Sequence, residues 1–168
     1  MLSIGREVIR FIALLSIKRI TQRPIDRKMT NKEKKKKLEK IVSIKKRILR
    51  ESCNLKANYK TTYKDIKKYF NIFNKALFKD ELNPFNDVQI KRMNGCWGQC
   101  VEDYSIRKGT RFFCLEMQPA YENKKEFLTT LGHEMIHLWQ QTIKKDTGNH
   151  NSLFYSFRPK FKKFGLSL

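Results

Sequence analysis

Three histidines lie close together near the end of the sequence, and two of them have a helical spacing. His133 and His137 enclose the pentapeptide His133-Glu134-Met135-Ile136-His137, which has the pattern H-E-x-x-H. Residues four apart lie on one face of a helix, so the two imidazoles can converge on one metal ion. Glu134 sits about 100° round the helix, where its carboxylate can take a proton from a water molecule beside the metal. The pattern is typical of a zinc site with a carboxylate base.

His150 is the expected third ligand. It follows His137 after enough residues for a turn and a return of the chain. A catalytic zinc takes three protein ligands and keeps a fourth position open. We therefore expect His133, His137 and His150 to bind one Zn²⁺ ion, and Glu134 to be the catalytic base. Asp146 is the only carboxylate after Glu134 and is the alternative third ligand.

Residues 123–145 have the pattern of the helix that must carry this motif. Asn123 can cap the first turn, with Glu126 three residues later. The expected apolar stripe consists of Phe127, Leu131, Met135, Leu138 and Ile143. Turn residues at 146–149 end the helix. Gln140 stands where a metzincin has the glycine that ends this helix, which argues against that class.

The remaining elements after residue 58 predict an α+β fold. Aromatic residues recur at helical spacing between Tyr63 and Phe78 and predict a buried helix. Alternating patterns then predict three short strands, joined by turns at Asn94-Gly95 and Lys108-Gly109, in an antiparallel sheet. The strands are expected at Val88–Arg92, Trp97–Val101 and Arg111–Met117.

The C-terminal residues predict a last helix behind the motif. Its apolar positions are Phe154, Phe157, Phe161 and Phe164, and Pro159 should kink or split it. The expected architecture is zincin-like, with a helix, a three-stranded antiparallel sheet, the H-E-x-x-H helix and a C-terminal helix.

The charge of the chain predicts a polyanionic partner. The net charge is +21, and residues 1–57 carry 18 Lys and Arg against 5 Asp and Glu, a net +13. Such an excess favours nucleic acid or an anionic membrane surface, although a solvated tail also fits a run of charge. We expect residues 1–57 to form a basic, helical or partly disordered extension and 58–168 to form the main domain. The candidate nucleic-acid contacts are Lys34, Lys35, Lys36, Lys37, Lys45, Lys46 and Arg47.

Cysteine usage and the N-terminal residues bear on the compartment. Four cysteines without a second pair at zinc-ribbon spacing indicate neither a disulfide framework nor an independent zinc site. We therefore expect a reducing, intracellular compartment, such as cytoplasm or nucleus. Residues 1–20 read as a basic amphipathic helix with an apolar run too short to span a bilayer, so packing or disorder is favoured over a membrane anchor.

The chain resembles the SprT-like metallopeptidase family, which includes Spartan-type proteases. The likeness covers residues 60–168 and rests on four segments in the family's order: Phe73-Asn74-Lys75-Ala76-Leu77-Phe78, Gly98-Gln99-Cys100, Leu131 to His137, and Gly148-Asn149-His150 leading into Phe154. The resemblance implies the same roles for the three histidines and Glu134. It also implies action on proteins on DNA.

The expected function is therefore a zinc-dependent endopeptidase, acting as a monomer on DNA-associated or DNA-crosslinked proteins. The DNA is expected to be single-stranded or to contain junctions, and no membrane partner is expected. Two alternatives stay open: a nucleic-acid-binding accessory protein whose zinc is structural, and a membrane-surface protease anchored by residues 1–20.

Overall fold

The computed structural model describes residues 30–52, 58–105 and 109–168 of the chain. The chain divides into two compact units, Met1–Lys37 and Leu38–Leu168. The predicted amphipathic segment at residues 1–20 lies outside the described residues, as do Cys53 and Lys108.

The described part of the first unit is the beginning of helix α2 (Asn31–Ser52). Thr30 forms a capping box with Glu33: its hydroxyl accepts from the Glu33 N–H at 3.3 Å, and its own N–H donates to the Glu33 carboxylate at 2.7 Å. The lysines that follow, from Lys34 to Lys37, are all exposed.

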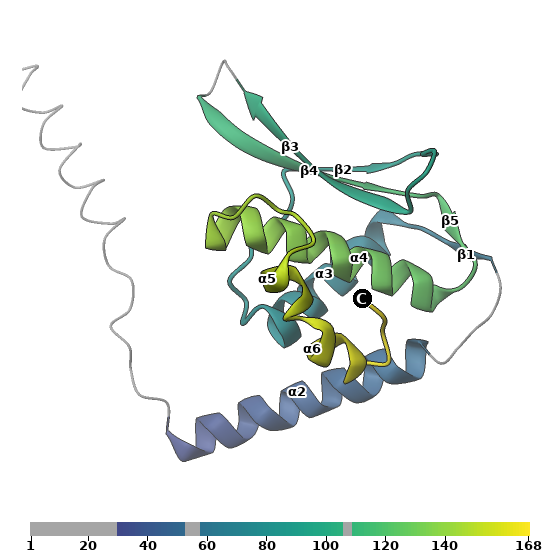
Figure 1. The fold of residues 1–168 in the computed structure, drawn as a ribbon. Coiled ribbons are helices and arrows are strands. Elements are labelled where there is room, and N and C mark those ends of the chain that lie inside the picture. Colours follow the sequence, from purple (N-terminus) through teal and green to yellow (C-terminus); the bar gives the residue numbers. More distant parts are fainter. Residues whose placement is uncertain (1–29, 53–57, 106–108) are drawn as a thin grey trace, which may run out of the picture. The chain divides into compact units, whose positions relative to one another are not determined.

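Helix α4 (Lys124–Trp139) is the central element of the second unit. A three-stranded sheet lies on one side of it, and helices α3 (Tyr63–Leu77), α5 (Ser152–Tyr155) and α6 (Arg158–Lys162) lie on the other (Figure 1). This α+β arrangement buries α4 on several faces, because both the sheet and the helices pack on it.

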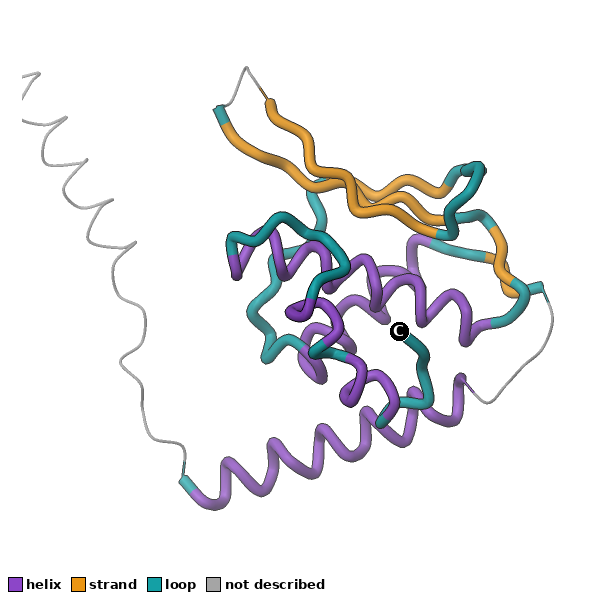
Figure 2. The backbone as a smooth tube through the Cα atoms, viewed as in Figure 1, coloured by secondary structure: helices purple, strands orange, loops and turns teal. Residues whose placement is uncertain are grey.

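The sheet consists of β2 (Asp87–Ile90), β4 (Thr110–Met117) and β3 (Gly98–Ser105), in that order. Strands β3 and β4 form a long antiparallel hairpin, paired from Gly98 with Met117 to Ser105 with Thr110 (Figure 2). The prediction of a wholly antiparallel sheet is wrong, because β2 pairs with β4 in parallel. Asn94-Gly95 is therefore not a hairpin turn but part of a longer crossover from β2 to β3.

A second sheet has two strands, one just before helix α3 and one just before helix α4. Strand β1 (Tyr59–Lys60) pairs antiparallel with β5 (Ala120–Tyr121). Strands of two residues are too short to give an alternating pattern, so the sequence does not indicate this sheet.

The core is rich in aromatic rings. The predicted aromatic face of α3 is confirmed for Phe70, Phe73 and the following Phe78, which are buried, but Tyr63 is 60% exposed. On α4 the predicted stripe is buried from Phe127 to Leu138. All four phenylalanines of the predicted C-terminal helix are buried, and Pro159 lies in the first turn of α6, where a proline is tolerated.

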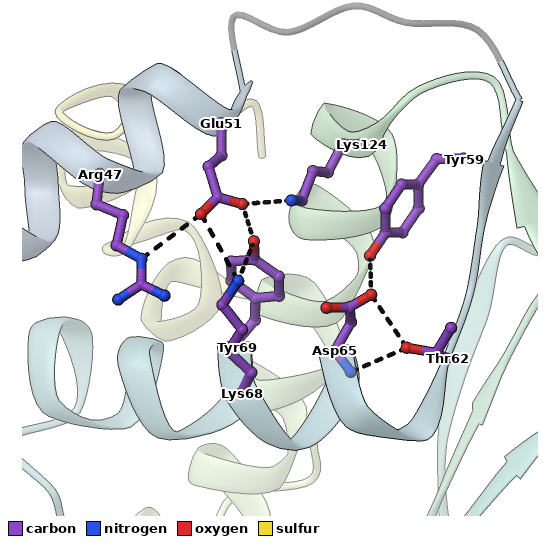
Figure 3. Close-up of polar contacts among 8 residues, drawn as sticks. All are labelled: Arg47, Glu51, Tyr59, Thr62, Asp65, Lys68, Tyr69 and Lys124. Carbon is purple, nitrogen blue, oxygen red and sulfur yellow. Dashed lines mark hydrogen bonds and ion pairs between the residues drawn. The ribbon is translucent and has the colours of Figure 1, made fainter.

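The last two turns of α2 pack on the second unit's core. Ile48 is fully buried, and Glu51 accepts hydrogen bonds from the Tyr69 hydroxyl of α3 and from Lys124 at the start of α4 (Figure 3). Burial alone would raise the pKa of Glu51, but the neighbouring Lys124 and Lys68 hold it below its usual value. Glu51 thus links helix α2 to both α3 and α4.

No helix in the described ranges combines the length and the apolar character that crossing a bilayer requires.

The packing of Ile48 predicts that this part of α2 belongs to the folded domain and not to a separable arm. Ile48→Ala should lower the free energy of unfolding by about 2–5 kcal/mol, because it leaves a cavity in the core. Leu38→Ala on the same helix, where the side chain is 62% exposed, should change it by less than about 0.5 kcal/mol. Urea unfolding of the full chain measures both. Equal effects of the two substitutions would contradict this packing.

Candidate metal centre

Helix α4 begins and runs as the sequence predicts. The Asn123 side chain caps it by accepting from the Glu126 N–H at 3.0 Å. The helical spacing then places His133 and His137 on one face. Both rings are half-buried, and both point into a cleft of about 500 Å³.

The helix ends in a wider turn that the sequence did not indicate. Residues Gln140–Lys144 form a π-helical turn, and Lys145 closes it in the left-handed conformation at φ 56°. The chain then reverses through Gly148, whose φ is +77° and where a Cβ would lie 2.4 Å from the Gln141 side-chain nitrogen. A glycine suits this position on both counts. The reversal brings His150 back over α4.

The three histidine side chains meet at one point, as predicted. The Nε2 atoms of His133 and His137 are 3.2 Å apart, those of His137 and His150 are 3.1 Å apart, and those of His150 and His133 are 2.9 Å apart. No other group of three or more His, Cys, Asp or Glu in the described ranges is placed to hold a metal ion.

This geometry fits a zinc ion. Two nitrogens bound to zinc at about 2.0–2.1 Å in a tetrahedral arrangement would be roughly 3.3–3.4 Å apart, close to the separations in the triad. Imidazole nitrogen is also a preferred ligand atom of Zn²⁺. His133, His137 and His150 could therefore hold a metal ion such as zinc.

The ring of Phe154 packs against the rings of all three histidines. Its ring centroid lies 4.8 Å from that of His133, 4.9 Å from that of His137 and 4.5 Å from that of His150. The phenylalanine is itself almost fully buried. A rigid apolar wall of this kind limits the orientations that each imidazole can adopt.

Gln140 orients His137 through a second contact. Its Oε1 lies 3.2 Å from His137 Nδ1, while its Nε2 donates to the Asp146 carboxylate at 3.0 Å and to the Asn149 carbonyl at 2.9 Å. Because the Gln140 amide nitrogen faces these two acceptors, its Oε1 faces His137 and accepts a hydrogen bond from the Nδ1–H of that ring. The lone pair of His137 is then on Nε2, the atom that faces the triad.

Asp146, the alternative third ligand, has another role. Its carboxylate accepts from the side chains of Asn151 and of Gln140, at 2.8 and 3.0 Å, and these contacts, chiefly the one from Asn151, hold its pKa below the usual value. Asn151 also caps α5 by accepting from the Phe154 N–H at 3.2 Å. Asp146 thus stabilises the segment that carries His150 and is not placed as a metal ligand itself.

Glu134 lies on α4 beside the triad and is almost fully buried, with 5% of its surface exposed. Burial raises its pKa to about 7, partly offset by a hydrogen bond from the Cys100 backbone N–H of β3. A carboxyl group with a pKa near neutrality can both accept and donate a proton at physiological pH.

Burial also keeps two of the histidines neutral. It lowers the pKa of His133 to about 4 and lowers the pKa of His137, and the neighbouring imidazoles act in the same direction. Neutral rings are the form that binds a metal, because only they carry a free lone pair.

The cleft lies between α4 and β3, an edge strand of the sheet. Gly98 at the start of β3 has no room for a side chain, since a Cβ would lie 2.5 Å from Thr130 Cγ2 of α4. This close approach brings the β3 backbone to Glu134. Trp97, 60% exposed, stands on the rim, where the Tyr121 hydroxyl donates to its carbonyl at 2.6 Å.

The predicted nucleic-acid residues are divided between the two units. Lys34 to Lys37 belong to the first unit, whereas Lys45, Lys46 and Arg47 are consecutive on α2 in the second unit and so point in different directions. Arg47 also forms an ion pair with Glu51 at 3.5 Å.

Sequence reasoning missed the residues that support the ligands. In the sequence Gln140 argues only against another peptidase class, although its place three residues after His137 puts it next to that ring. Asn151 is the N-cap of α5. An asparagine just before an apolar helical pattern is a signal of such a cap, and it could have been found in the sequence.

No protein-family model, curated protein or solved structure matches the chain. The resemblance to SprT-like peptidases thus rests on the residues already named. What the geometry adds is a three-histidine group on α4 and just after it, which is the layout that an H-E-x-x-H site requires.

The contact between Gln140 and His137 predicts an effect on zinc affinity. Gln140→Leu should weaken zinc binding by about 10–100-fold, as loss of a ligand's supporting hydrogen bond does. Gln89→Leu, on the surface of β2, is the matched control and should leave the affinity unchanged. Competition with a chromophoric chelator measures both. If the Gln140 variant bound zinc like the control, the proposed orientation of His137 would be wrong.

The raised pKa of Glu134 predicts a pH-dependent stability difference. In the unfolded chain this group ionises near its ordinary value of 4.5, but in the folded protein only near 7. The wild type therefore loses stability as the pH rises from 4.5 through 7, by up to about 3 kcal/mol.

For the metal-free protein, Glu134→Gln should be more stable than the wild type at pH 8, with a much smaller difference at pH 5 that vanishes below pH 4.5. Urea unfolding in the presence of a chelator at the two pH values measures this. A difference of the same size at both values would show that the carboxylate is not desolvated.

Proposed function

We propose that this chain is a zinc-dependent endopeptidase of the SprT-like type that acts on DNA-associated or DNA-crosslinked proteins. The observation that carries the proposal is the position of Glu134, which is buried beside three converging imidazoles and opens on a cleft. A structural metal site has no need of such a carboxylate, and burying one without a cationic partner is costly.

The chain's own residues would divide the reaction between them. His133, His137 and His150 would hold the zinc ion, which when bound acidifies a water molecule and polarises the scissile carbonyl. Glu134 would take a proton from the attacking water and return it to the leaving amine.

The cleft would accept a protein substrate in an extended conformation. β3 is an edge strand, so its outer backbone groups are available to pair with another strand. Its Cys100 N–H already holds the Glu134 carboxylate, which sets that base at the same edge.

DNA as the partner is supported by charge and by the family resemblance. The net charge of +21 would attract a polyanion, and Lys34 to Lys37 are exposed. The free thiols of Cys96, Cys100 and Cys114 fit a reducing intracellular compartment. We also propose that the protein acts as a monomer.

Peptidase activity is tested with the purified full chain and casein or histone as substrate, with and without single-stranded DNA. Glu134→Gln should keep its zinc but cleave at least about 10²-fold more slowly, as expected for loss of a general base. Glu122→Gln, an exposed acid just before α4, is the control and should cleave normally.

His150→Ala completes that test, because it should weaken zinc binding at least about tenfold and abolish cleavage. A wild type that binds zinc but cleaves no protein, with or without DNA, would leave the structural-zinc alternative as the better account.

The basic extension predicts a salt-dependent affinity for DNA. Each lysine that neutralises a phosphate of single-stranded DNA adds about 0.7 to the slope of log affinity against log salt. Replacing Lys34, Lys35, Lys36 and Lys37 by alanine should lower the slope by up to about 3. Fluorescence anisotropy with a labelled oligonucleotide measures it. An unchanged slope would exclude these lysines as DNA contacts.

A further inference from the structure

The solvent face of helix α3 carries a row of exposed lysines. Lys64, Lys67 and Lys75, together with Asn71, recur at intervals of three and four residues and are all exposed. The row is roughly 16 Å long at the helical rise of 1.5 Å per residue. None of these three lysines forms an ion pair with a described residue.

The acidic residue of α3, Asp65, lies roughly 100° round the helix from Lys64 and so faces away from this row. Asp65 accepts a hydrogen bond from the Tyr59 hydroxyl at 2.8 Å and from the Thr62 hydroxyl at 3.0 Å, as Figure 3 shows. Among the described residues, no carboxylate is paired with the lysines of this face.

An apolar hollow of about 400 Å³ opens beside the lysine row. Tyr63, Phe70, Pro84 and Phe85 contribute to its walls, and Lys67 and Asn71 of the row stand at its edge. Phe70 and Phe85 hold one another edge-to-face, with ring centroids 5.8 Å apart. Tyr63 is 60% exposed, so one ring at the hollow is free to stack on a flat ligand.

These features together match the chemistry of a single strand of nucleic acid. Proteins bind such strands by combining lysine contacts to phosphates with aromatic rings on which bases stack. A peptide partner would use the apolar hollow but would not need the row of cations beside it.

We propose that α3 and this hollow form a single-stranded nucleic-acid site, with a base stacked on Tyr63 and phosphates on Lys64, Lys67 and Lys75. The inference rests on the DNA association in the proposed function and adds the site at which the catalytic domain itself makes that contact.

The position of the hollow suits that function. Val88 of β2 lines the hollow, whereas Gly98 and Cys100 of β3 line the cleft beside the histidines. β2 and β3 are the opposite edges of one sheet, with β4 between them. Nucleic acid bound at α3 therefore leaves the β3 edge open to a protein attached to the same strand.

Photocrosslinking with the full chain tests where the base lies. A thymidine oligonucleotide that contains 5-bromouracil is irradiated with the protein, and the crosslinked peptide is mapped by mass spectrometry. The site predicts a crosslink at Tyr63. Crosslinks confined to residues 1–57 would overturn it.

Affinity measurements in the same buffer test the energetics. Tyr63→Ala should weaken binding of oligothymidylate about tenfold or more, and Tyr63→Trp should retain it, because stacking on an aromatic ring is what is lost. Tyr104→Ala, at an exposed tyrosine of β3, is the control and should bind normally.

Replacing Lys64, Lys67 and Lys75 by alanine should lower the salt slope by about 2. The same replacement at Lys145, Lys162 and Lys163, which are also exposed, should lower it less. Equal slopes for the two triple variants would overturn the site.

The outcomes separate this inference from the proposed function. A wild type that does not bind oligothymidylate would refute both the site and DNA association. Normal binding by Tyr63→Ala would refute the site alone, and if that variant also lost activity on casein without DNA, the hollow would be assigned to a protein partner. Cleavage of DNA-free casein by the Tyr63 variants and by the triple variant of Lys64, Lys67 and Lys75 should equal that of the wild type.

Discussion

The candidate site depends on the close approach of three imidazole nitrogens that face one another. A neutral imidazole has one N–H and one lone pair, and Gln140 places the lone pair of His137 on the inward nitrogen. Metal binding requires an inward lone pair on each of the three rings, and at separations of 2.9–3.2 Å three such lone pairs would repel one another without a cation among them. The surrounding structure therefore has to hold the rings in place. Phe154 does so through packing, and Gln140, Asp146 and Asn151 do so through hydrogen bonds.

The same environment that favours a metal ion makes the carboxylate reactive. Glu134 lies between α4 and β3 because Gly98 lets the strand approach the helix closely. The resulting burial disfavours its charged form and brings its pKa toward neutrality. The metal-free protein is thus less stable at neutral pH than it would be without this buried carboxylate. Such a loss of stability is expected at a catalytic site and not at a structural one.

Local signals in the sequence were sufficient for α4 and for the meeting of the three histidines. The cap at Asn123, the H-E-x-x-H spacing and the split of the last helix at Pro159 all depend on neighbouring residues, and the structure agrees with each. Non-local pairing was not predictable in this way. The parallel pairing of β2 with β4 joins segments more than twenty residues apart, and the π-helical turn after Trp139 has no periodic signal. The division of the chain at residue 57 stays a prediction, although Ile48 packs in the core of the unit that starts at Leu38.

The most direct test of the central claim is X-ray absorption at the zinc edge on the purified full chain, together with elemental analysis. Three imidazoles and one oxygen should surround one zinc per chain, with zinc–nitrogen distances of about 2.0–2.1 Å. Cys96 and Cys100 line the same cleft, so sulfur is the ligand that could replace a histidine there. Zinc–sulfur scattering at about 2.3 Å, or the absence of stoichiometric zinc from protein prepared without a chelator, would contradict the account.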